Sequence, residues 1–346
     1  MNTTAKHSET TNSNNITDER SMGEFAKITF SGYKTIQATK KLLDSLSTSK
    51  IEASCYWTAE LVCSGHYADL WETIFLFYGR NVHVANPKLA IYLGGKLNKF
   101  KENMNNASSA QEQLNFRNEP AFRHLFCEIV TVLCLSDKKF TLQYARVPDE
   151  DFDLIVLKTN LIAPDFRHGE RIILPDDPKE LLVTVNELQY NMSLGVVNTM
   201  RAYYWVEWLL EYAKLCKKRK QPCLLQARSE MLNDIVDTKF HRNAVWLIWD
   251  AILHEAKEKR SDMVNKVVSA LFQMFALRYS EVHNTRRKSL IYFAVTLLTN
   301  CAAGAVEDSV MVRDKTRLAC MMAQIDAVFV QVQTQGQVQQ GAELKP

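Results

Sequence analysis

Residues that break helices are scarce in this sequence. Glycine occurs 11 times and proline 8 times in 346 residues, well below their usual combined share of roughly 12%. A β-sandwich or barrel needs many tight turns, so this scarcity argues against both and favours long helices. Hydrophobic residues make up 47% of the chain, which is enough for a substantial core and excludes a wholly disordered protein.

Long apolar runs and closely paired cysteines are also missing. No stretch of 18 apolar residues occurs, so we expect no membrane-spanning helix, and the polar residues 1–21 lack the apolar segment of a secretory signal. None of the eight cysteines belongs to a Cys-x-x-Cys pair. We therefore expect reduced, mostly buried thiols and an intracellular, reducing compartment. The net charge of +3 is too small to indicate a nucleic-acid-binding protein by itself.

Apolar patterns of helical period occur in two separate regions, residues 31–138 and 179–332. Each predicts a helical domain, of bundle or short helical-repeat type. Between them, residues 139–178 hold four of the eight prolines together with acidic runs such as Asp149–Asp151. We interpret this segment as an extended connector and domain boundary. The predicted fold is therefore all-α, with two helical lobes joined by a Pro/Asp-rich connector.

Composition also marks the two ends of the chain. Residues 1–30 are polar and are predicted to form a disordered arm. Residues 333–346 are rich in Gln and Gly and are predicted to form a disordered tail. Within the connector, residues 140–145 and 172–174 are candidates for short strands.

The motifs of common enzymes and metal sites are incomplete. The Gly-Gly-Lys run at residues 94–96 is followed by Leu97 instead of the Ser or Thr of a phosphate-binding loop. Cys63 and His66 have the spacing of metal ligands, but a structural zinc needs four ligands and no second pair is present. We therefore predict a protein that is not an enzyme and needs no metal or cofactor. A catalytic site assembled in space, for example from Cys63, His66 and His83, stays open as an alternative.

Two basic clusters are the most concrete candidate for a functional site. The first ends a long helix predicted over residues 197–220, and the second lies between two predicted helices. The clusters consist of Lys214, Lys217, Lys218, Arg219 and Lys220, and of Arg286, Arg287 and Lys288. Cations at a helix C-terminus complement the helix dipole, which is a purely structural role. The alternative is contact with the phosphates of DNA or RNA. Clusters on one face would favour nucleic acid, and clusters on opposite faces a scaffold.

Aromatic residues crowd the same long helix. Tyr203, Tyr204 and Trp208 lie in different directions around it. Core packing is one interpretation. The other is that some of these rings bind a partner chain, because Trp and Tyr are frequent anchors of interfaces.

Several stretches resemble an uncharacterised protein family of nucleocytoplasmic large DNA viruses, the giant viruses. They are Ser54–His66, Asn86–Leu89, Tyr204–Glu211, Cys216–Cys223 and Lys239–Asp250. The resemblance implies a viral protein in the host cytoplasm, the viral factory or the virion. Combined with the missing catalytic motifs, it leads us to expect a non-catalytic helical scaffold or assembly protein. Its partners would be other viral proteins or further copies of itself. The alternative is a nucleic-acid-binding accessory factor of viral replication or transcription.

A shorter stretch is similar to the helical collar of clamp-loader-type ATPases. The similarity consists of Tyr56-Trp57, Gly65 and the run Ala-Asn-Pro at residues 85–87, in which Asn86 stands where the collar has an acidic residue. It implies an oligomerising collar without the ATPase motor.

Overall fold

The computed structural model describes residues 16, 18–139, 142–233, 235–300 and 304–343. These residues form sixteen α-helices joined by short 3₁₀ and π turns, and no β-strand occurs among them. The predicted all-α fold is thus confirmed. At the two places where short strands were considered, residues 142–145 and 172–174, the backbone is irregular. Residues 140 and 141 lie outside the described part of the chain.

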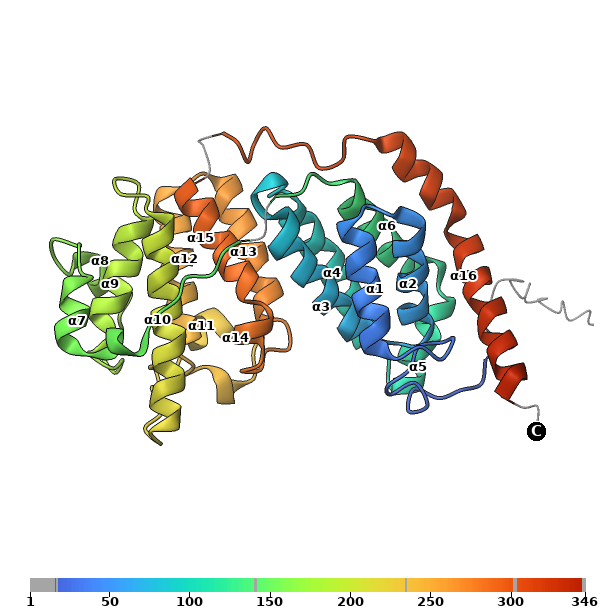
Figure 1. The fold of residues 1–346 in the computed structure, drawn as a ribbon, viewed down its shortest axis with the longest axis horizontal. Helices are drawn as coiled ribbons and strands as arrows, with labels where there is room; N and C mark the ends of the chain where they lie inside the picture. Colours follow the sequence, from blue (N-terminus) through green and yellow to red (C-terminus); the bar gives the residue numbers. More distant parts are fainter. Residues whose placement is uncertain (1–15, 17, 140–141, 234, 301–303, 344–346) are drawn as a thin grey trace, which may run out of the picture. The chain divides into compact units, whose positions relative to one another are not determined.

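Contacts divide the chain into two compact units (Figure 1). Unit 1 comprises residues 1–74, 98–135 and 312–346, and unit 2 comprises residues 75–97 and 136–311. These units differ from the domains expected from the sequence. The C-terminal segment joins the N-terminal helices in unit 1, and the whole connector over residues 139–178 belongs to unit 2.

Unit 1 is built around two antiparallel neighbours, α2 (Ile51–Cys63) and α6 (Pro120–Leu135). Their outer faces are covered by α1 (Thr35–Ser47) and α16 (Lys315–Glu343). The remaining helices with residues in the unit are α3 (Tyr67–Phe77), α4 (Leu89–Asn105) and α5 (Ala110–Asn115). An aromatic core holds α3, α4 and α6 together, with ring centroids 5.5–6.0 Å apart in its Trp and Tyr contacts. It consists of Tyr67, Trp71, Phe100, Phe122 and Phe126.

The segment before α1 is packed rather than disordered. Phe25 and Phe30 are buried, and the guanidinium of Arg20 lies 4.6 Å and 5.0 Å from their ring centroids. The backbone N–H of Ser31 donates to the buried carboxylate of Glu60 on α2. This corrects the expectation of a disordered arm for residues 18–30, while residues 1–15 lie outside the described chain.

Helix α16 also departs from the expectation for its region. It continues to Glu343 instead of ending near residue 332, and it packs on α2 and α6 of unit 1. The buried side chains of Ile325, Phe329 and Val332 form its contact stripe. At Gly336 a Cβ atom would meet the ring of Phe30 at 2.6 Å, so only glycine allows the helix to approach this closely.

His66 follows α2 and ties the N-terminal segment to unit 1. Its Nε2 lies 2.9 Å from the carbonyl oxygen of Ile28, and its Nδ1 lies 3.5 Å from Asp69 Oδ2. Burial alone lowers the pKa of His66, but the hydrogen bonds to Asp69 and Ile28 outweigh burial and raise the pKa above its ordinary value. A protonated imidazole can donate to both oxygens at once.

This arrangement predicts a pH-dependent stability. Because the pKa of His66 is higher in the folded chain, its contribution is complete below about pH 6.5 and is lost as the pH rises through the folded pKa. We expect the melting temperature of the wild type to fall more between pH 6 and pH 8 than that of His66→Gln. The variant Asp69→Asn should also show a smaller fall in melting temperature over this pH range than the wild type. Equal losses in all three proteins would contradict the assignment.

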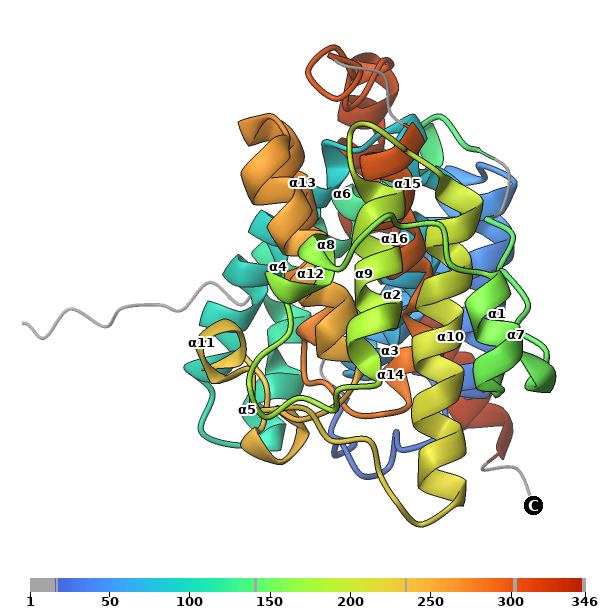
Figure 2. The ribbon, with the colours of Figure 1, turned by 90° about the vertical axis from the view of Figure 1, so that its left-hand side faces the viewer.

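Unit 2 is a bundle in which α9 (Leu181–Met192) lies between α10 (Thr199–Lys218) and α12 (Val245–Lys259), as Figure 2 shows. Helices α13 (Asp262–Ala276) and α15 (Lys288–Asn300) complete its core. Trp205, Trp246 and Trp249 are fully buried inside it. Short helices lie at its edges: α7 (Leu154–Thr159), α8 (Arg167–Glu170), α11 (Ser229–Leu232) and α14 (His283–Arg286).

The expected connector is docked on this bundle. The carbonyl of Asp151 accepts a hydrogen bond from the Trp208 indole, and its carboxylate accepts one from the hydroxyl of Tyr204. The buried carboxylate of Glu187 on α9 accepts hydrogen bonds from the backbone N–H groups of Ile162 and Ala163. The Pro/Asp-rich segment is therefore a folded part of unit 2, and its acidic run at residues 149–151 is used for packing.

Candidate functional site

The two predicted basic clusters meet at one cavity of unit 2. This cavity, which we call the α10 groove, has a volume of about 350 Å³. It is lined by the C-terminal half of α10, residues 222–224, the beginning of α12 and residues 281–288. Lys214 and Lys217 come from the first cluster and Lys288 from the second. The clusters thus share one face.

The end of α10 explains how the groove wall forms. The N–H of Gln221 donates to the Cys216 carbonyl at 3.0 Å and that of Lys220 to the Lys217 carbonyl at 3.1 Å, which is the pattern of a Schellman turn. Lys220 has the positive φ of 58° that such a turn requires. The chain then reverses, and Leu224 forms an isolated antiparallel bridge with Asn243 ahead of α12. Residues 222–224 are held in this way against the start of α12.

Each lysine that lines the groove has a carboxylate partner. Lys214 Nζ lies 2.6 Å from Glu211 Oε1, and Lys217 Nζ lies 2.5 Å from Glu281 Oε2. Lys288 Nζ lies 2.7 Å from the buried Glu207 Oε1 and also stands 4.4 Å from the ring centroid of Tyr144. The inside of the groove is therefore close to neutral.

Four cations of the two clusters form no ion pair with any described residue; they are sequence neighbours of groove-lining residues, and we call them the rim cations. Lys218, Arg219, Lys220 and Arg286 are all exposed, and within the described chain no ion pair is formed by any of the four. The apolar side chains of the lining include Leu210, Ala213, Pro222, Leu224 and Val245. An apolar trough bordered by free cations is the chemical character of this site.

Arg287 does not belong to this site, which corrects its assignment to a phosphate-binding cluster. Its side chain is buried, and Nη1 donates to the carbonyls of Met274, Phe275 and Leu277 at 2.6–3.1 Å. These carbonyls are at the C-terminal end of α13, where a cation satisfies groups that have no partner in the helix. Arg287 is thus a cap of α13 and cannot reach a ligand.

The aromatic residues proposed for partner binding are also inside unit 2. Tyr203 is buried and stacks on Tyr292 with ring centroids 4.0 Å apart. Trp208 is buried, and Tyr204 is half-buried with its hydroxyl bonded to Asp151. Tyr203 packs on α15, and Tyr204 and Trp208 hold the connector against α10, which corrects the expectation that these rings face a partner.

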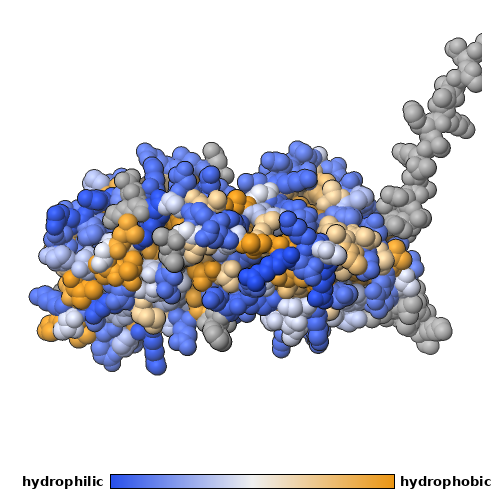
Figure 3. All heavy atoms as spheres, turned by 90° about the horizontal axis from the view of Figure 1, so that it is seen from above, coloured by the Kyte–Doolittle hydropathy of each residue, from blue (hydrophilic) through white to orange (hydrophobic). Residues whose placement is uncertain are grey.

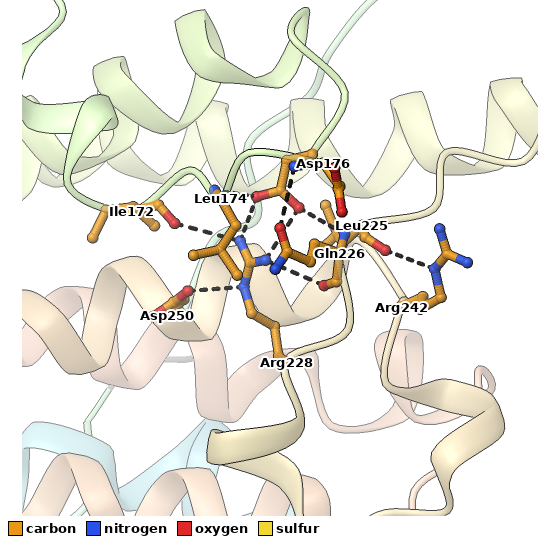
Figure 4. A network of polar contacts seen from close by, with 9 residues as sticks. Ile172, Leu174, Asp176, Leu225, Gln226, Arg228, Arg242 and Asp250 are labelled. Atoms are coloured by element: carbon orange, nitrogen blue, oxygen red, sulfur yellow. Dashed lines mark hydrogen bonds and ion pairs between the residues drawn. The ribbon is translucent and has the colours of Figure 1, made fainter.

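Sequence reasoning did not identify the strongest buried charge cluster, which surrounds Arg228 (Figure 4). Nη2 and Nη1 of Arg228 lie 2.7 Å and 3.1 Å from the two carboxylate oxygens of Asp177. Nε lies 2.9 Å from Asp250 Oδ2 on α12. The side chains of Arg228 and Asp177 are 4% and 0% exposed, so this is a buried ion pair with well-formed geometry.

The same cluster supports the groove wall. Asp177 accepts hydrogen bonds from the backbone N–H groups of Leu174 and Gln226, and the side chain of Arg242 donates to the carbonyl of Leu225. These bonds fix residues 225–228 directly after the wall at residues 222–224. Asp177 and Arg228 are 51 positions apart, so the sequence holds no local signal by which the pair could be found.

The residues considered for a catalytic or metal site are placed apart from one another or used in packing. Burial raises the pKa of the Cys63 thiol, so it stays protonated, and His66 is used in packing as described above. His83 belongs to unit 2. Among the described residues no group of three or more His, Cys, Asp or Glu side chains could hold a metal ion. Nor is any described helix long and apolar enough to cross a membrane.

A second surface feature is the apolar end of unit 2 that carries α7 to α10. Orange side chains gather there in the view from above (Figure 3). The exposed apolar residues of these segments are Ile155, Ile162, Phe166, Leu194, Val197 and Met200. Hydrogen bonds from Arg201 to the Asn160 carbonyl and from Asn160 to Tyr204 connect the segments. Exposed apolar patches of this kind are typical of protein–protein contacts.

Comparison with protein-family models, with curated proteins and with solved structures gives no match.

Proposed function

We propose that this chain is a non-catalytic helical scaffold or assembly protein that binds a short segment of a partner protein in the α10 groove. The observation that carries the proposal is the combination of an apolar lining with an uncompensated basic rim. The resemblance to proteins of large DNA viruses supports a viral partner, in the virion or the replication factory.

The apolar lining sets the first requirement for the ligand. Leu224 is 42% exposed and lines the groove. Burying such surface against an apolar side chain of the partner is favourable by about 25 cal/mol per Å². A cavity of about 350 Å³ has room for one or two large apolar side chains.

The rim sets the second requirement. Lys218, Arg219 and Lys220 follow the lining residue Lys217 in the sequence, and Arg286, the last residue of α14, follows the lining residue Thr285. Carboxylates on either side of the apolar anchor would pair with these cations, which favours encounter and orientation. The expected ligand is therefore a peptide segment with a large apolar residue flanked by Asp or Glu.

The test is a selection of phage-displayed random peptides on the immobilised protein. We expect the enriched peptides to contain a large apolar residue with acidic neighbours. Leu224→Asp, which places a carboxylate in the apolar lining, should weaken the selected peptide by at least about tenfold, or about 1.4 kcal/mol. Affinity is measured by fluorescence anisotropy with a labelled peptide.

A matched control is Ile36→Asp, because Ile36 is an exposed apolar residue of α1 in unit 1. It should leave peptide affinity unchanged. Enrichment of peptides without acidic residues, or equal affinities of Leu224→Asp and wild type, would contradict the proposal.

A second function, nucleic-acid binding by an accessory factor of replication or transcription, is favoured by one observation. The two basic clusters line the same groove, as phosphate contacts would require. Against it, Lys214, Lys217 and Lys288 are already paired with carboxylates and Arg287 is buried. Only the four rim cations are left for phosphates, so we rank this function second.

A further inference from the structure

Two cysteines lie on either side of the turn that ends α10. Cys216 is in the last turn of the helix, and Cys223 follows the Schellman turn at Lys220. Both thiols line a second cavity of about 340 Å³, together with Tyr212 and Arg219. Cys223 also lines the α10 groove, so this residue forms part of the wall between the two cavities.

The turn brings the two residues together although seven positions separate them. The bond from Gln221 N–H to the Cys216 carbonyl closes the turn directly over Cys216. Cys223 then lies two residues beyond this closure and shares a cavity wall with Cys216. Consistent with their proximity, each thiol influences the ionisation of the phenol of Tyr212.

Accessibility distinguishes this pair from the four buried cysteines of unit 1. Cys55, Cys63, Cys127 and Cys134 are buried in unit 1, whereas Cys216 and Cys223 are both half-exposed. Cys320, on α16, is exposed. An oxidant that enters from solvent can therefore reach the pair without unfolding the chain.

We propose that Cys216 and Cys223 form a redox-active dithiol that a peroxide converts into an intramolecular disulfide. The Cys216 sulfur attacks the peroxide ROOH and breaks its O–O bond, which gives a sulfenic acid and the alcohol ROH, or water when R is hydrogen. The Cys223 sulfur then attacks the sulfenic sulfur, the S–S bond forms, and water leaves with the Cys223 proton. The two thiols lose two electrons in total, and these reduce the peroxide.

The order of the two steps follows from the surroundings of the thiols. Burial raises the pKa of Cys223 to about 12, so this sulfur stays protonated until it meets an activated partner. Cys216 is thus the peroxide-reactive residue and Cys223 the resolving one.

The disulfide would also act on the groove, a consequence that rests on the proposed function. Cys223 lies between Pro222 and Leu224 in the groove wall. A bond from Cys223 to the last turn of α10 would add a covalent restraint to this wall. The peptide affinity of the oxidised protein should then differ at least about threefold from that of the reduced protein.

The chain offers a direct chemical test. The folded protein is treated with hydrogen peroxide, free thiols are blocked with N-ethylmaleimide, and the protein is digested with trypsin. Because trypsin cleaves after the basic residues at positions 217–220, the disulfide appears in mass spectrometry as two linked peptides. We expect this linked pair in the wild type and in Cys320→Ser, and its loss in Cys216→Ser.

The outcomes separate the site from its effect. The proposed disulfide would be overturned if N-ethylmaleimide still blocks both Cys216 and Cys223 after peroxide treatment. It would also be overturned if the two residues are linked only between molecules. A linked pair with unchanged peptide affinity would overturn the effect on the groove but leave the disulfide in place. Absence of any selected peptide would count against the proposed function alone, because the mass-spectrometric result does not depend on it.

Discussion

Replacing Arg228 with methionine is expected to lower the free energy of unfolding by about 3–5 kcal/mol. The loss arises because the carboxyl group of Asp177, whose side chain is fully buried, would be left without its guanidinium partner. Asp250 would lose the same guanidinium, and residues 225–228 would lose their anchor. The change is measured by urea denaturation followed by circular dichroism.

Two controls separate the buried charge from other effects. Arg167→Met removes an exposed guanidinium that pairs with Asp165, and we expect no measurable change, as is usual for surface pairs. The double variant Arg228→Met, Asp177→Leu removes both buried charges and should recover much of the lost stability. If Arg228→Met is as stable as Arg167→Met, the cluster is not the anchor described here.

Truncation of Trp249 to alanine is the second large effect, with an expected loss of about 3–5 kcal/mol. Trp249 is fully buried on α12, and its ring centroid lies 5.5 Å and 5.3 Å from those of Phe272 and Phe275 on α13. Its indole N–H has no hydrogen-bond partner in the described part of the chain. The loss should therefore reflect the cavity and the missing packing alone.

Trp57 provides the comparison for this truncation. It is only half-buried and packs edge-on against Tyr33 and Tyr56. Trp57→Ala should cost clearly less than Trp249→Ala in the same urea titration, because the site is open to solvent and no closed cavity forms. A larger loss for Trp57→Ala would mean that the core of unit 2 is not centred on α12 and α13.

The helical character of the chain could be predicted from local features. Few glycines and prolines and a 3.6-residue apolar period are properties of single segments, and the long helix expected over residues 197–220 corresponds to α10 over Thr199–Lys218. The packing of α16 on unit 1 could not be predicted in this way. It depends on a contact between Gly336 and Phe30, which are far apart in the chain.

The candidate site was predictable only in part for the same reason. Runs of lysine and arginine are visible in the sequence, and the structure brings both runs to one groove. Whether a cation is free or used depends on distant partners: Lys288 pairs with Glu207, and Arg287 caps α13. The connector was misjudged because its prolines suggest an extended chain, while Glu187 and Trp208 on the bundle supply the hydrogen bonds that dock it.

The most direct test of the account is one anisotropy titration with two labelled ligands, the selected acidic peptide and a DNA duplex, at about 50 mM salt and above. Four proteins are compared: wild type, Leu224→Asp, the rim variant Lys218→Glu with Arg286→Glu, and Lys40→Glu as an exposed charge control on α1. We predict that the peptide binds wild type and Lys40→Glu equally and is weakened at least about tenfold in both groove variants. The contrary result is that no peptide binds while the duplex binds tightly and with a strong dependence on salt, and that duplex binding is lost in the rim variant but kept in Leu224→Asp. This result would contradict the scaffold account and establish nucleic acid as the ligand.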